Sequence, residues 1–207
     1  MYALDANEAR KADNTGNSIR EMGKYTGKFI QAEDITASTG TKGVALTFEA
    51  NGQKTRFSLY TKRANGEIIM GFQALMSIMA CLKLRNITPQ QGTITFWDNE
   101  ARAEKTKTGT VFPELCGKPI GLLLETEDYL NRDGEVRTRM VFAGAFQSGS
   151  ELTATEILDQ KTKPEQLEKM VAYLRHRPVK AAKGATAAIA PSKPSSGFDD
   201  MDDDIPF

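Results

Sequence analysis

The chain has 207 residues, of which 40% are hydrophobic, and its 27 basic side chains balance its 27 acidic ones. This composition is typical of a globular protein with one sizeable core or two small ones. The N-terminal residues are polar and charged, and no apolar run approaches the roughly 20 residues that span a bilayer, which argues against secretion and membrane insertion. Two cysteines, Cys81 and Cys116, lack metal-ligand or disulfide-framework spacing and favour a reducing, cytoplasmic location.

The zero net charge hides an asymmetry between the body and the C-terminal residues. All Lys and Arg residues precede Gly197, whereas five aspartates follow it, so residues 1–197 carry a net charge of +5. A basic body indicates a polyanionic partner, and an acidic tail indicates a different, basic partner.

The first half of the chain is typical of a flexible arm followed by strands. Residues 1–23 lack an apolar period, although a short helix within 5–11 stays open. Residues 25–35 predict a first strand, and residues 44–48 alternate apolar and polar side chains as a second strand does. Asn51-Gly52 predicts a type I′ hairpin turn into a third strand over 53–60.

The second half combines helices, strands and a linker. Apolar residues at helical spacing predict a helix over 68–84, and residues 93–97 are compatible with a short strand. Residues 98–109 are charged without apolar periodicity and predict an exposed loop. Strands are expected over 120–126 and 136–146, a last helix over 164–175, and a disordered Ala/Lys/Pro/Ser/Gly linker over 178–197.

This order of elements indicates a mainly β, α+β domain over 24–177. Three strands, a helix and two further strands match an OB-fold, a five-stranded, partly open barrel, here with an inserted helix, a C-terminal helix and a disordered tail. Other small β-rich α+β domains give similar patterns.

Residues 198–207 combine a charge cluster with an apolar end. Clustered aspartates keep the peptide solvated, while Pro206 restricts Ile205 to extended conformations. Phe207 offers a large ring together with a carboxylate, a pair that a hydrophobic pocket flanked by Arg or Lys can hold.

The segment Asp202-Asp203-Asp204-Ile205-Pro206-Phe207, preceded by Phe198-Asp199-Asp200-Met201 and a Pro/Ser/Gly linker, resembles the C-terminal tip of bacterial single-stranded DNA-binding proteins. The resemblance implies that the tip recruits replication, recombination and repair proteins such as helicases, exonuclease I and polymerase-holoenzyme subunits. The arm, the helix and the charged insertion depart from the bacterial family, so its tetrameric assembly is not carried over, and homo-oligomerisation stays open. The body more loosely resembles the divergent single-stranded DNA-binding proteins of phages and other mobile elements.

Binding of single-stranded DNA without sequence readout needs cations along the phosphates and aromatic rings for base stacking. Lys54, Arg56 and Tyr60 share a face of the predicted third strand, and Arg137 and Arg139 share a face of the last one. The full set of expected DNA contacts is Lys42, Lys54, Arg56, Tyr60, Lys62, Arg63, Trp97, Arg102, Lys105, Lys107, Phe112, Arg137 and Arg139.

The sequence offers little support for catalysis, and no metal or cofactor is expected. The single histidine, His176, lies between two arginines, where a surface or phosphate-contact role is favoured over general-base chemistry. Asp98, Glu100 and Glu104 are more typical of a solvated loop than of a nuclease metal site. The expected function is to coat single-stranded DNA and recruit enzymes through the tip. The alternatives are an adaptor or decoy that uses the tip without binding DNA, and a nuclease or other enzyme.

Overall fold

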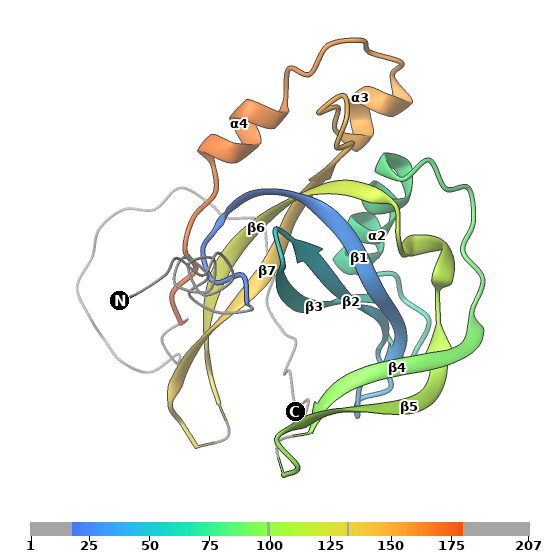
Figure 1. Cartoon of the computed structure of the whole chain (residues 1–207). Coiled ribbons are helices and arrows are strands. Elements are labelled where there is room, and N and C mark those ends of the chain that lie inside the picture. Colours follow the sequence, from blue (N-terminus) through green and yellow to red (C-terminus); the bar gives the residue numbers. More distant parts are fainter. Residues whose placement is uncertain (1–17, 99, 132, 180–207) are drawn as a thin grey trace, which may run out of the picture.

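The computed structural model of the protein describes residues 18–98, 100–131 and 133–179. Most of the expected arm, nearly all of the expected linker and the whole of the expected tip lie outside these residues. The described part is built on one antiparallel sheet (Figure 1). Its strands are β1 (Gly23–Thr36), β2 (Lys42–Ala50), β3 (Gln53–Lys62), β4 (Gln90–Asp98), β5 (Ala103–Val111), β6 (Pro119–Leu130) and β7 (Val136–Phe146).

The long strand β1 organises the sheet because it pairs with three others. One of its edges pairs with β2 over residues 28–36, and the other pairs with β6 over residues 23–28 and with β5 at Glu33. β3 extends the sheet beyond β2, β7 extends it beyond β6, and β4 extends it beyond β5. The mainly β, α+β class expected from the sequence is therefore confirmed.

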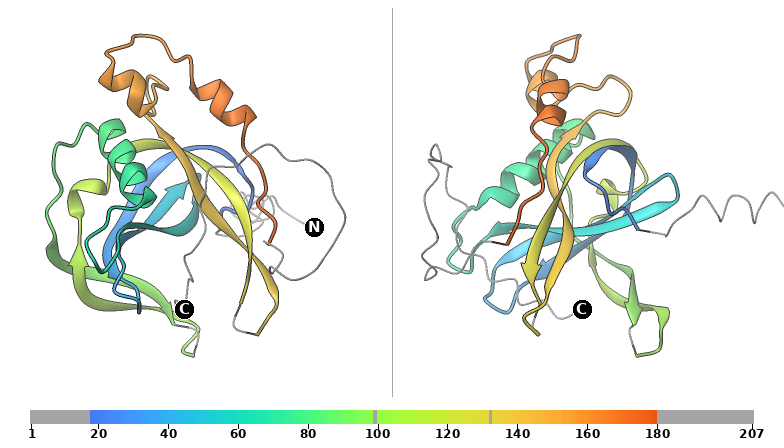
Figure 2. Two further views of the ribbon diagram at one scale, coloured as in Figure 1. Left: turned by 180° about the vertical axis from the view of Figure 1, so that it is seen from behind. Right: turned by 90° about the vertical axis from the view of Figure 1, so that its left-hand side faces the viewer.

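The two outer strands β3 and β7 approach each other as the sheet curls (Figures 1 and 2). The ring centroids of Phe57 on β3 and Phe142 on β7 are 6.0 Å apart. Among the described residues no hydrogen-bonded ladder joins these strands, so the sheet is curled but not closed.

The described sheet has seven strands, two more than the five expected for the barrel. Residues 98–109, expected to form a loop, contain most of β5, which pairs with β4 along its whole length from Gln90↔Val111 to Asp98↔Ala103. Most side chains of β5 are exposed, so its sequence has no need of alternating apolar residues. Apolar periodicity reports burial, and a solvated hairpin gives no such signal.

The turn between β2 and β3 has the expected geometry. Asn51 has φ = 51° and Gly52 has φ = 76°, the two positive values that a type I′ turn requires. Burial alternates as predicted along β3, where Phe57 is buried and Arg56 is exposed, whereas Val44, Ala45 and Leu46 of β2 are all buried. The local pattern was therefore sufficient to place this hairpin.

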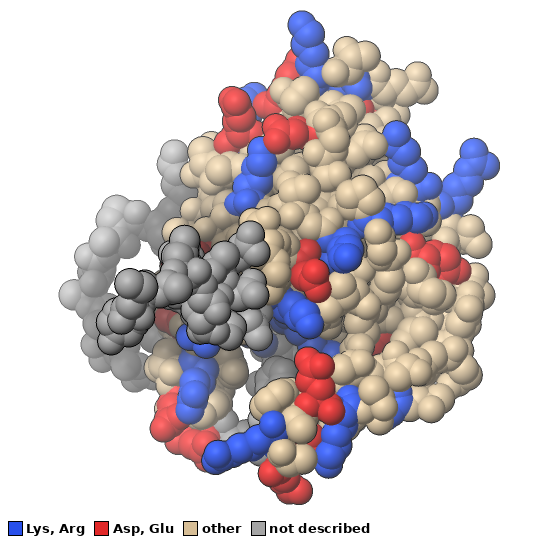
Figure 3. Space-filling model, in the orientation of Figure 1, with Lys and Arg blue, Asp and Glu red and all other residues tan. Residues whose placement is uncertain are grey.

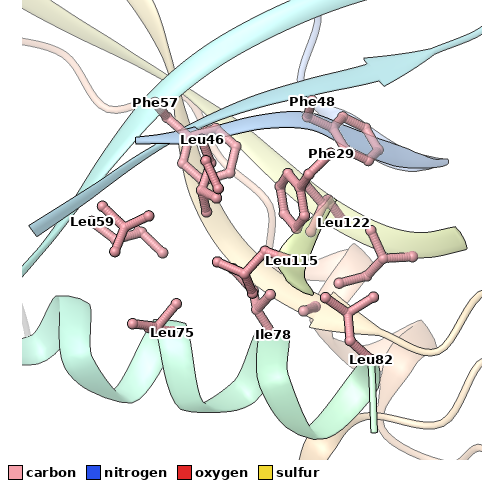
Figure 4. Packing of buried hydrophobic residues seen from close by; sticks show 14 of the residues in the cluster. Phe29, Leu46, Phe48, Phe57, Leu59, Leu75, Ile78, Leu82, Leu115 and Leu122 are labelled. Carbon is pink, nitrogen blue, oxygen red and sulfur yellow. The ribbon is translucent and has the colours of Figure 1, made fainter. Parts of the chain in front are cut away.

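The expected helix over 68–84 is α2 (Met70–Cys81). It packs against the strands through Leu75 and Ile78 (Figure 4). A Cβ atom on Gly71 would lie 2.0 Å from the carbonyl oxygen of Tyr60, so glycine permits the close approach of α2 to β3. The remaining helical segments among the described residues are the short η1 (Pro113–Leu115), α3 (Ala154–Leu158), which was not expected, and α4 (Leu167–Ala172) within the expected 164–175.

The main core lies between the curled sheet and α2. Phe29 of β1 meets Phe48 of β2 edge to face, with ring centroids 5.7 Å apart (Figure 4). Ile19, four residues before β1, is also buried, and its N–H donates to the carbonyl oxygen of Lys54 at 2.9 Å. This contact ties the chain ahead of β1 to the start of β3.

Candidate nucleic-acid interface

The outward face of strands β1, β2 and β3 carries polar side chains in register. Gln31 of β1 lies opposite Thr47 of β2, which lies opposite Arg56 of β3. In the next row, Glu33 lies opposite Ala45. The small side chain of Ala45 leaves room across β2, and Arg56 reaches over that strand to Glu33.

Three charged side chains from three strands meet on this face, and we call them the Glu33 cluster. Glu33 Oε2 is 2.7 Å from Arg56 Nη2, and Glu33 Oε1 is 3.2 Å from Lys107 Nζ of β5. Glu33 is only 7% exposed, whereas the side chains of Arg56 and Lys107 are 38% and 54% exposed. The cluster therefore presents two cations to solvent above one buried carboxylate.

The β4–β5 hairpin is attached to β1 beside this cluster. The side-chain amide of Gln31 donates to the carbonyl oxygen of Thr95 at 3.2 Å and accepts from the N–H of Thr95 at 2.8 Å. On the same face of the hairpin, Lys107 Nζ lies 5.8 Å from the centroid of the Phe96 ring, and Lys105 pairs with Asp98 at 2.5 Å. The hairpin thus joins an aromatic ring and two lysines to the face of β1–β3.

Trp97 lies on the opposite face of the same hairpin. Strand alternation places it with Thr95, away from Phe96, and it is 59% exposed. An indole this exposed is available for stacking with a base. Arg102, in the turn of the hairpin, is also exposed.

The β6–β7 hairpin carries a second group of aromatic and basic side chains. Arg139 pairs with Glu127 at 2.9 Å, and its guanidinium lies 5.2 Å from the centroid of the Tyr129 ring. Arg137, directly opposite Tyr129, pairs with Glu135 at 2.7 Å. A guanidinium over a tyrosine ring is a flat cationic surface of the kind on which bases stack.

The two hairpins project from the same end of the molecule (Figures 1 and 2). Lys and Arg side chains lie on both hairpins, interspersed with Asp and Glu (Figure 3). The surface of the two hairpins therefore carries both basic and acidic side chains, and several of its cations are already paired.

The structure separates nine of the ten expected cationic DNA contacts into two groups. The first group comprises paired cations near the hairpins, namely Arg56, Lys105, Lys107, Arg137 and Arg139. The second group comprises Lys42, Lys54, Lys62 and Arg102. None of these four cations has an acidic partner within 4.0 Å among the described residues. Lys42 lies opposite Lys62 at one end of the β2–β3 pair, next to Arg63, which pairs with Glu67 at 3.2 Å.

The aromatic residues expected to contact DNA differ in how far they are buried. Phe112 is 9% exposed and belongs to the main core, so its ring is not available to a base, and we correct that expectation. Tyr60 is half-buried on the outward face of β3. Sequence reasoning missed Phe96 and Tyr129. Their alternation with polar neighbours was visible, but the lysine and arginine that lie over their rings come from partner strands.

The single histidine takes part in docking the end of the described chain onto β6. His176 Nδ1 is 3.0 Å from the Thr126 hydroxyl, and Nε2 is 2.9 Å from Asp128 Oδ2. The main chain of Arg177 exchanges two 2.8 Å hydrogen bonds with the main chain of Thr126 and Asp128. Residues 178 and 179 therefore leave the body beside the β6–β7 hairpin.

The described residues include no group of three or more His, Cys, Asp or Glu side chains placed to hold a metal ion. Burial raises the pKa of the Cys81 thiol to about 12, which leaves it protonated at neutral pH. Within the same residues, every helix is too short or too polar to cross a bilayer.

Comparison with known proteins adds no family to this description. No family model matches the sequence, and neither does any curated protein.

Proposed function

We propose that the chain is a non-catalytic single-stranded DNA-binding protein whose body covers exposed strands and whose residues 202–207 recruit replication and repair enzymes. The observation that carries this proposal is the sequence Asp202-Asp203-Asp204-Ile205-Pro206-Phe207, with its resemblance to the tip of bacterial single-stranded DNA-binding proteins. An acidic tail that served solubility alone has no need of an Ile-Pro-Phe ending.

The strand order supports an OB-type body. In this interpretation β1, β2, β3, β6 and β7 are the five barrel strands, β1 pairs with both β2 and β6, and α2 follows the third barrel strand. The β4–β5 hairpin is then an insertion between α2 and β6. OB-folds are partly open barrels, so the absence of a ladder between β3 and β7 within the described residues is compatible with this assignment.

The surface supports a polyanionic, base-stacking ligand. Exposed Trp97 and the Tyr129–Arg139 pair offer flat surfaces, and the lysines and arginines of β3, β5 and β7 offer charge. Stacking on aromatic side chains contributes about 1–3 kcal/mol per base and does not depend on sequence.

The test is the binding of a fluorescent oligothymidine to the full chain at two salt concentrations, with duplex DNA as competitor. We expect tight binding that weakens as salt rises, with a log–log slope of about −0.7 per phosphate contact, and little competition by duplex. Absence of binding, or equal preference for duplex, would contradict the proposal.

One observation favours the adaptor as a second candidate. Six of the expected DNA-contacting cations already have acidic partners, which lowers the charge available to phosphates. An adaptor would bind repair enzymes through residues 202–207 and leave oligothymidine free. Measuring both ligands on one preparation distinguishes the two functions.

A further inference from the structure

Glu33 is an acidic side chain in the middle of a surface for which we propose a polyanionic ligand. Its carboxylate contacts Arg56 from β3 and Lys107 from β5, and it is nearly buried. By charge alone, an acid at this place repels phosphates. The same acid, however, holds together two cations that would otherwise repel each other.

The contacts around Glu33 connect strands β1 and β3 to the β4–β5 hairpin. Gln31, two residues earlier on the same face of β1, binds both main-chain groups of Thr95. Lys107 spans the junction, since its amine lies near Glu33 on one side and over the ring of Phe96 on the other. The position of Lys107 relative to Arg56 is thus set by one carboxylate.

We propose that Glu33 is the positioning residue of the DNA interface, holding Arg56 and Lys107 so that their remaining donors bind one backbone phosphate of single-stranded DNA. This inference rests on the proposed function. A guanidinium has five N–H donors and an ammonium has three, so the ion pairs with Glu33 leave donors for a phosphate. The cluster keeps a net charge of +1, and its cations need little further ordering when DNA binds.

A positioning role for Glu33 and a purely repulsive one predict opposite effects of Glu33→Gln on the affinity for oligothymidine. If Glu33 acts only as a negative charge, its removal tightens binding of oligothymidine. If Glu33 positions the two cations, they separate in the variant and their shared phosphate contact is lost. We expect binding on the order of five- to tenfold weaker, despite the gain of one positive charge. Unchanged or tighter binding would overturn the proposal.

The salt dependence separates positioning from a general loss of structure. Loss of one phosphate contact lowers the magnitude of the log–log salt slope by about 0.7. A partly unfolded variant would instead show a smaller active fraction in a stoichiometric titration, with the same slope. We expect the slope of Glu33→Gln to fall and its active fraction to stay at the wild-type value. A wild-type slope would contradict the inference.

Glu165→Gln is the matched control because Glu165 is an exposed acid, paired with Lys161 in the segment between α3 and α4. The Glu165→Gln change removes the same charge without affecting the Glu33 cluster, and we expect no weakening of oligothymidine binding. In the background Arg56→Gln/Lys107→Gln, the further change Glu33→Gln should leave binding unchanged or tighten it, because no cations remain to be positioned. Weakening in that background would count against the proposal.

Two exposed-residue variants keep the inference testable if Glu33→Gln fails to fold. Arg56→Gln and Lys107→Gln should each lose the shared phosphate, so the double variant should lose little more affinity than the weaker-binding single one. Fully additive losses would show two separate contacts and would overturn the proposal. If the wild-type chain itself does not bind oligothymidine, the proposed function fails, and that result is visible before any variant is compared.

Discussion

Glu156 shows how one buried carboxylate can organise a segment without apolar periodicity. Its Oε2 accepts hydrogen bonds from the N–H and the hydroxyl of Thr153, and the Thr153 side chain accepts from the N–H of Glu156, which completes a capping box at the start of α3. Its Oε1 accepts from the N–H groups of Glu165 and Gln166 at 2.6 and 3.0 Å, just before α4. Burial alone raises the pKa of Glu156, but these hydrogen bonds outweigh it and lower the pKa to about 2.

Glu156→Gln should therefore destabilise the protein at neutral pH. The amide NH₂ would face N–H donors, leaving buried groups unsatisfied at a cost of about 1–3 kcal/mol. The carboxylate's contribution is complete above its ordinary pKa of 4.5 and is lost as the pH falls toward about 2. Thermal unfolding should thus show a lower Tm for the variant at pH 7, and the difference should shrink by pH 3. The exposed Glu165→Gln serves as the control, and a difference independent of pH would contradict this assignment.

Helices and strands were predictable from the sequence where one of their faces is buried. Strand β3 and helix α2 bury one face each, so their periods of two and 3.6 residues are visible in the chain. The β4–β5 hairpin is largely exposed, and its second strand looks like a charged loop. What makes residues 103–111 a strand is pairing with β4, an interaction that local sequence does not report.

The same hairpin carries the chain's single tryptophan, which makes its role directly measurable. If Trp97 stacks on bases, Trp97→Ala should weaken binding of oligothymidine by about 1–3 kcal/mol and leave the salt slope unchanged, because no ion contact is lost. Tyr173→Ala is the control, since Tyr173 is 81% exposed at the end of α4, away from the hairpins (Figure 1). Equal effects of the two variants would indicate that Trp97 is not a DNA contact.

At the scale of the whole molecule, opposite charges are divided between the body and residues 198–207. The last described residues leave the body beside the β6–β7 hairpin, where Arg137 and Arg139 lie. We therefore expect the acidic residues to compete with DNA for the basic surface, most strongly at low salt, where charges are least screened.

Deletion of residues 198–207 should tighten oligothymidine binding at low salt by a few fold, about 1 kcal/mol or less, and have little effect at high salt. Fluorescence titrations at both salt concentrations measure this difference. Phe207→Ala keeps all five aspartates of the tail and should leave DNA affinity unchanged while losing partner enzymes. An unchanged affinity after the deletion would exclude competition without affecting the proposed DNA binding.

The information available in the sequence was local. Alternation, helical spacing and the Asn51-Gly52 turn predicted β2, β3 and α2, and the motif at 202–207 indicated a partner-binding segment. The Glu33 cluster was not predictable, because Arg56 and Lys107 lie 23 and 74 residues after Glu33 along the chain, and only the register of β1, β2, β3 and β5 brings the three together. Local patterns record which side chains are buried, whereas tertiary pairing decides which distant charges meet.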